Sequence, residues 1–158
     1  MIESQSSVSP DKGSPEVFKM TPIVYILLER NGRILLSKRS HRSRFAGRWG
    51  LPAGHLEDGE KTPETAIREA REELGIDIDP SDLKFVHTLN LKDHDGQRVG
   101  FIWRTSKWKG KPRNIEPEKC AGLLWVAPKK LPKNTGPHIV LALSNIRRGV
   151  RVTEYGWE

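Results

Sequence analysis

Residues 54–76 read GHLEDGEKTPETAIREAREELGI, and this stretch carries the clearest helix signals in the chain. Thr62 can cap a helix, Pro63 suits its first position, and Gly75 suits its end. The sequence therefore predicts a helix over residues 62–75, preceded by a short acidic loop.

The predicted helix has an acidic face and an apolar face. At about 100° per residue, Glu69, Glu72 and Glu73 share one arc, and the opposite arc holds Pro63, Ile67, Ala70 and Leu74. Like charges at this spacing repel each other, so the acidic face favours a bound cation, and oxygen ligands suit Mg²⁺ or Mn²⁺. On helical geometry alone, the favoured interpretation is a solvated charged face, with Arg68 paired to Glu72.

Strands are predicted on both sides of this helix. Two apolar runs, 23–28 and 33–39, flank Asn31-Gly32, which is a strong hairpin signal because both residues accept positive φ. Residues 40–56 are expected to form an ordered loop. Later segments predict three strands and a second helix, over 83–91, 97–105, 123–126 and 137–148 respectively. This mixture of predicted strands and helices indicates an α/β or α+β layered fold with a mixed sheet.

Charge is distributed unevenly along the 158 residues. The net charge is +7, but residues 54–79 contain nine acids and three bases, so this segment carries −6 and the remainder +13. An acidic cluster can hold a divalent cation while basic surroundings attract a polyanion, either a phosphorylated small molecule or a nucleic acid.

Composition excludes several classes of protein. There is no long uncharged apolar run for a membrane helix and no secretory signal pattern at the N-terminus. A single cysteine, Cys120, excludes an intrachain disulfide and a cysteine-built zinc site. We therefore expect a cytoplasmic protein. Residues 1–18, rich in Ser, Pro and Glu, are expected to be a disordered tail.

The spacing within residues 54–76 resembles the Nudix box, G-x5-E-x7-R-E-U-x-E-E-x-G-U, in which U is apolar. Every specified position matches, from Gly54 and Glu60 through Arg68 to Ile76, with the small residue Ala70 at the inner apolar position. The hairpin before the box, the WGLPAG loop at 49–54 and the strand–helix segment after it also resemble a Nudix domain. The resemblance implies a Nudix-type α/β/α sandwich with a mixed β-sheet, which we expect over residues 19–158.

Enzymes of this family hydrolyse a nucleoside diphosphate linked to another group, with Mg²⁺ as the cofactor and Mn²⁺ as a substitute. The resemblance implies that Arg68 orients a catalytic glutamate and that Glu69 helps to activate water. It also implies a set of metal ligands: the Ala53 carbonyl, Glu69, Glu72 and Glu73. Glycine at position 54 lets the backbone approach metal and phosphate closely.

A further metal carboxylate often comes from a later loop in this family. In the MutT-like pattern it follows a Trp-x-Gly-x-Pro stretch, here residues 108–112, but the position expected to be acidic is Lys111. We assign Glu116 in its place and keep Glu118 as the alternative. An acid in a surface loop accounts for Glu116 equally well.

Three further residues match positions that contact substrate in MutT-like enzymes. Arg39 matches a phosphate contact, Leu51 a residue of the base pocket, and Asn134 a loop residue that recognises a purine. The alternatives are a surface arginine for Arg39 and a turn before the last helix for Asn134.

Two classes of function remain open. The first is a pyrophosphohydrolase of a nucleoside triphosphate or related nucleotide, with ADP-ribose and dinucleoside polyphosphates as other substrates. The second is a non-catalytic module that senses a nucleotide or binds RNA. The complete set of box carboxylates favours the enzyme. We expect a small nucleotide substrate, no membrane association and no stable nucleic-acid complex, and a homodimer remains open.

Overall fold

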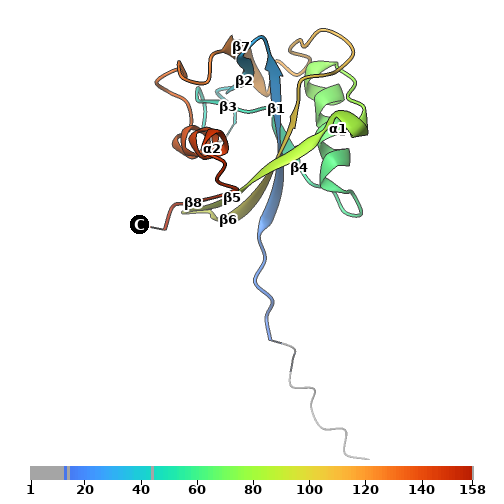
Figure 1. Cartoon of the computed structure of the whole chain (residues 1–158). Coiled ribbons are helices and arrows are strands. Elements are labelled where there is room, and N and C mark those ends of the chain that lie inside the picture. Colours follow the sequence, from blue (N-terminus) through green and yellow to red (C-terminus); the bar gives the residue numbers. More distant parts are fainter. Residues whose placement is uncertain (1–12, 14, 44, 158) are drawn as a thin grey trace, which may run out of the picture.

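The structure, a computed structural model, describes residues 13, 15–43 and 45–157. Most of the predicted tail, residues 1–18, lies outside the described residues. Residues 15–20 belong to neither helix nor strand, and they extend away from the body of the molecule (Figure 1). The boundary between tail and domain remains a prediction.

A mixed sheet of eight strands forms the centre of the described chain. The strands are β1 (Thr21–Arg30), β2 (Arg33–Arg39), β3 (Trp49–Gly50), β4 (Ala53–His55), β5 (Lys84–Asp93), β6 (Gly96–Thr105), β7 (Cys120–Val126) and β8 (Val152–Tyr155). The main path runs β3-β2-β1-β6-β5-β8, with β4 paired to β1 and β7 paired to β2. The β1–β6 and β5–β8 pairs are parallel and the other pairs are antiparallel.

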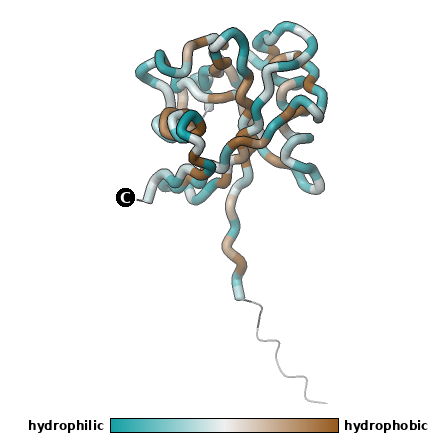
Figure 2. Tube along the Cα trace, viewed as in Figure 1, coloured by the Kyte–Doolittle hydropathy of each residue, from teal (hydrophilic) through white to brown (hydrophobic). Residues whose placement is uncertain are grey.

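Two helices cover opposite faces of this sheet (Figure 1): α1 (Thr62–Leu74) and α2 (Pro137–Arg147). Successive residues of a strand point to opposite faces, so β1 contributes to both cores. Val24 and Ile26 pack in the α1 core, whereas Tyr25 and Leu27 pack in the α2 core. In Figure 2, hydrophobic stretches follow the strands and the outer loops are mostly hydrophilic. The predicted α/β/α sandwich is confirmed.

At the ends of α1, one prediction from the sequence is wrong and one is confirmed. Thr62 was expected to cap the helix, but the N-cap is Lys61, and the Glu64 carboxylate accepts from its backbone N at 2.9 Å. Thr62 is instead the first helical residue, and its hydroxyl accepts from Trp103 Nε1 at 3.1 Å. Gly75 ends the helix with φ of 66°, as predicted.

The short strands depart most from the expectations. The segment 40–56, expected to be a loop, contains β3 and β4, and β8 was not anticipated. A two- or three-residue strand is too short to show alternation, so its pairing is decided by distant partners. The other strands occur as predicted, with β1, β5, β6 and β7 longer than expected. The Asn31-Gly32 turn has positive φ at both residues, which confirms the hairpin. Among the described residues, no helix, the short 3-10 helix η1 (Pro80–Asp82) included, is long and apolar enough to cross a membrane.

A buried histidine ties β5 and β8 to α2. His87 Nδ1 lies 3.0 Å from the Val150 carbonyl, and its Nε2 lies 2.6 Å from Thr153 Oγ1. Because a carbonyl only accepts, Nδ1 carries the proton and Nε2 accepts from the threonine hydroxyl. Thr153 Oγ1 in turn accepts from Asn145 Nδ2 at 2.9 Å. The three side chains therefore form a connected polar network inside the protein.

We predict that Thr153→Val lowers the free energy of unfolding by about 1–3 kcal/mol, because it leaves both His87 Nε2 and Asn145 Nδ2 buried without a partner. Urea unfolding followed by circular dichroism measures the change. The control Thr21→Val, at an exposed strand residue, should change stability by less than about 0.5 kcal/mol. Equal effects of the two variants would contradict the prediction.

Candidate active site

One guanidinium organises the acidic face of α1. Arg68 Nε and Nη2 donate to both carboxylate oxygens of Glu60, at 2.8 and 3.1 Å, and Nη2 also donates to the His55 carbonyl at 3.0 Å. Its Nη1 donates to Glu69 at 2.7 Å and to Glu72 at 3.3 Å. Arg68 thus fixes the side chains of Glu69 and Glu72 and joins α1 to the loop after β4.

Glu60 is the counter-charge of this guanidinium. The hydrogen bonds from Arg68, with further ones from Thr65 Oγ1 at 2.7 Å and Glu57 N at 3.1 Å, hold its pKa at about 2. Glu60 therefore stays ionised at any physiological pH. These contacts hold the acidic loop against the helix.

Gly54 provides the space for Glu69. A Cβ atom at position 54 would lie 2.0 Å from Glu69 Cδ and 2.1 Å from its Oε1. Gly54 is held in β4 by pairing with Val24 of β1, so the backbone has little freedom to retreat. The Glu69 carboxylate thus lies directly over a residue that cannot carry a side chain.

Negative charge on α1 is only partly compensated. Burial, together with the nearby carboxylates of Glu69 and Glu116, raises the pKa of Glu73 to about 8. Burial also raises the pKa of Glu69, although Arg68 opposes the shift. Glu72 is half exposed. A hard divalent cation suits an oxygen-only set with this excess of negative charge.

Glu116 reaches the site through the C-terminus of α1. The last carbonyls of a helix lack partners within it, and here Glu73 O and Leu74 O accept from the backbone N of Ile115 and Arg113, at 3.2 and 3.0 Å. This pairing holds the loop between β6 and β7 against the helix and brings Glu116 beside Glu73.

A cavity of about 470 Å³, which we call the first cavity, collects these groups. It is lined by every predicted site residue except Asn134: Arg39, Leu51, Ala53, Gly54, Arg68, Glu69, Glu72, Glu73 and Glu116. Lys119, which the sequence analysis missed, also lines it, with Nζ 3.2 Å from Glu116 Oε2. The lysine lies three residues after Glu116, a spacing that could have pointed to the pair.

Other candidates lie elsewhere. Glu118 and Lys111 are exposed and do not line the first cavity. Asn134 donates from Nδ2 to the Gly47 carbonyl at 2.7 Å, so its amide ties together two loops, and it does not line the first cavity. We therefore base no substrate contact on Asn134.

Another group of side chains, at the β5–β6 turn, has ligand atoms close enough together to hold a metal ion. Among the described residues, the ligand atoms of Asp93, His94 and Asp95 lie within 4.8 Å of one another, whereas the α1 glutamates are not grouped so closely. His94 and Asp95 are exposed at the β5–β6 turn, and Asp93 is paired with Arg98 at 2.6 Å. We assign no metal to this turn.

Comparison with known proteins decides the family. The model of the NUDIX domain matches residues 19–142. The chain belongs to the Nudix hydrolase family. It is 28% identical over 113 residues to the CTP pyrophosphohydrolase of Escherichia coli, covering 71% of this chain and 79% of that protein. The 8-oxo-dGTP diphosphatase of the same organism is 27% identical over 94 residues, 60% and 71% of the two chains.

Solved structures give the same result. The crystal structure of the MutT Nudix hydrolase from Burkholderia pseudomallei has a TM-score of 0.74 and 29% identity, covering 80% of this chain and 98% of the other. This Nudix protein is accordingly a hydrolase of phosphoric anhydrides, and its family acts on nucleotide diphosphate linkages.

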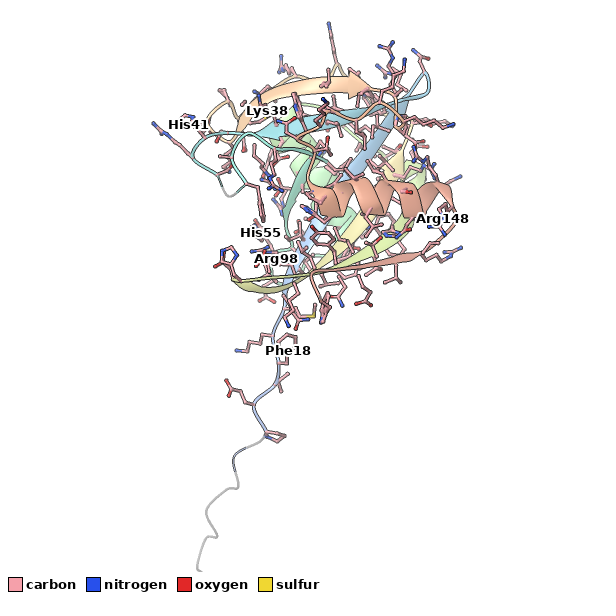
Figure 3. The ribbon with its side chains drawn as sticks, turned by 90° about the vertical axis from the view of Figure 1, so that its left-hand side faces the viewer. Phe18, Lys38, His41, His55, Arg98 and Arg148 are labelled. Carbon is pink, nitrogen blue, oxygen red and sulfur yellow. The ribbon has the colours of Figure 1, made fainter. Side chains whose placement is uncertain are left out.

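A smaller second cavity, of about 160 Å³, adjoins the first. Ile23, Arg39, Leu51 and His55 line both. The rest of its wall comes from the β2–β3 loop, from several strands and from the start of α2, including Arg48, Arg98 and His138. Figure 3 shows His55 and Arg98 next to each other. The two cavities are therefore parts of one continuous surface.

We predict that Gly54→Ala lowers hydrolytic activity by on the order of 100-fold, because the new Cβ displaces the Glu69 carboxylate. Steady-state turnover measures the effect. Gly122→Ala is the matched control, since a Cβ there meets nothing closer than Trp49 at 3.9 Å. Full activity of the Gly54 variant would show that Glu69 need not lie where the structure has it.

His138 should make stability depend on pH. Burial and the nearby Arg48, Arg39 and Arg98 lower its pKa from 6.5 to about 4, while Asp93 opposes the shift. The unfolded chain therefore binds the proton more readily, so this contribution to stability is complete above pH 6.5 and is lost as pH falls toward 4. At about pH 5 the loss amounts to about 2 kcal/mol.

Urea unfolding at pH 7 and at pH 5 measures this effect. His138→Gln should flatten the pH dependence, whereas His41→Gln, on the outer loop labelled in Figure 3, should leave it unchanged. An unaltered pH dependence in the His138 variant would contradict the prediction.

Proposed function

We propose that this Nudix hydrolase is a Mg²⁺-dependent pyrophosphohydrolase of a nucleoside triphosphate. The observation that carries the proposal is the arrangement of charge in the first cavity. Four glutamates, on α1 and in the β6–β7 loop, form an acidic wall, and the cationic side chains Arg39 and Lys119 line the same cavity. The names of the two Escherichia coli relatives, both of which act on a nucleoside triphosphate, support this substrate class.

The residues of the first cavity divide into two roles. Glu69, Glu72, Glu73, Glu116 and the Ala53 carbonyl are the oxygen ligands proposed for Mg²⁺. When bound, the cation neutralises phosphate charge and makes a water molecule a better nucleophile. Arg68 holds Glu69 in place to accept a proton from the attacking water. Arg39 and Lys119 donate hydrogen bonds to phosphate oxygens.

The remaining alternatives are outcomes of the same assay. ADP-ribose and dinucleoside polyphosphates share the diphosphate linkage, and a sensor would bind a nucleotide without turnover. The cytoplasmic location and the homodimer remain predictions.

The decisive experiment measures phosphate and pyrophosphate release from canonical-base and oxidised nucleoside triphosphates, ADP-ribose and dinucleoside polyphosphates. We expect Mg²⁺-dependent turnover of triphosphates that is abolished by a chelator and restored by Mn²⁺. Glu73→Gln should lower kcat at least about 100-fold, because stabilisation of the transition-state charge is lost.

Glu64→Gln is the matched control on the same helix. Glu64 is exposed and accepts from Lys61 N, and glutamine can fill that capping position. Full turnover without a divalent cation, or an unchanged rate in the Glu73 variant, would refute the proposed mechanism. Nucleotide binding without turnover of any substrate would identify a sensor.

A further inference from the structure

Arg98 is held in a fixed orientation at the second cavity. Its Nη1 donates to Asp93 Oδ2 at 2.6 Å, and the two side chains are only 14% and 17% exposed. The other carboxylate oxygen of Asp93 accepts from Asp95 N at 2.8 Å, at the turn where β5 and β6 meet. Asp93 is thus anchored at both oxygens, and it orients the guanidinium through the hydrogen bond from Nη1.

The remaining donors of Arg98 are available to a ligand. A guanidinium has five N–H groups and accepts no hydrogen bond. Among the described residues, Asp93 is the one hydrogen-bond partner of the Arg98 side chain. Arg98 lines the second cavity beside His55 (Figure 3), so its unused N–H groups can reach a group bound there.

The rest of the wall offers a ligand many donors and few acceptors. No Asp or Glu is among the described residues that line the second cavity, whereas Arg39 and Arg48 add two further cations. Tyr25, 6% exposed, and His138 make no side-chain hydrogen bond with another described residue, and each can donate or accept. Hydrophobic side chains, including Trp49, Leu51 and Ile139, complete a wall that suits a flat ring.

We propose that Arg98, positioned by Asp93, makes the second cavity select a base that presents a carbonyl oxygen over one that presents an amino group in the same place. A carbonyl or ring nitrogen accepts from the guanidinium, whereas an amino group would face it donor to donor and leave buried N–H groups unpaired. The inference rests on the proposed function, because the diphosphate must occupy the first cavity for the base to reach the second.

Substrate pairs that differ by an oxo or amino group test the selectivity. We expect kcat/KM to be at least about tenfold higher for inosine triphosphate than for ATP, and higher for UTP than for CTP. Arg98→Met should bring both ratios close to one. Arg98→Lys keeps the charge but loses the planar fork, so it should retain only part of the preference.

Two further variants separate selectivity from folding. Asp93→Asn should weaken the preference mainly through KM, because it weakens the hydrogen bond that orients Arg98. Arg104→Gln, on the same strand but paired with Glu29 at 3.0 Å, is the control and should leave the ratios unchanged. Thermal unfolding confirms that each variant is folded.

Titration calorimetry with the α,β-methylene analogues of inosine and adenosine diphosphates, which keep both phosphates but resist cleavage between them, tests the same preference without turnover. Tighter binding of the inosine nucleotide that is lost in Arg98→Met supports the inference, even if neither triphosphate is hydrolysed. A lack of hydrolysis would refute only the proposed function. Equal binding, preference for the amino base, or a preference unchanged in Arg98→Met would overturn the inference, whatever the hydrolysis assay shows.

Discussion

The Arg68 guanidinium donates to three carboxylates, from the β4–α1 loop and from α1, and to one carbonyl at the end of β4. Glutamates one turn apart on a helix repel each other, and burying them without a partner costs still more. Arginine is always charged and presents its donors in a rigid fork, so one side chain can fix several carboxylates at once. The acidic face keeps its geometry before any cation arrives, because the protein supplies one permanent positive charge at its edge.

Space around two glycines determines where the other groups lie. Gly54 leaves room for the Glu69 carboxylate, and Gly75 leaves room for Ile115, whose Cδ1 would lie 2.7 Å from an added Cβ. The first contact fixes the helix relative to β4, and the second allows the β6–β7 loop to pair with the helix C-terminus. The box glycines therefore position a strand on one side of α1 and a loop on the other, and the first cavity lies between them.

The parts of the structure that could be predicted from sequence depend on neighbouring residues. Helix α1 and the Asn31-Gly32 hairpin are set by local propensities, and the box residues are recognised by spacing alone. The missed features depend on distant partners. Lys61 replaces Thr62 as the cap because Glu64 folds back onto it, while Trp103, from β6, engages the threonine. Asn134 contacts Gly47, 87 residues away. No local pattern places Arg98 beside α2 either, since the β5–β6 hairpin and the helix meet only through the tertiary fold.

The two cavities bear on a charge distribution that the sequence left open to two interpretations, a phosphorylated small molecule or a nucleic acid. The segment with charge −6 contains α1 and lies along the first cavity, while several of the basic side chains gather at the second. Arg39 lines both and faces glutamates on one side and the basic wall on the other. A nucleotide has the matching asymmetry: its diphosphate can be shared between a cation on the acidic wall and the basic side chains, and its base can occupy the donor-rich cavity beyond. The proposed nucleotide substrate, lying across this boundary, would place its negative charge beside the basic side chains near the site.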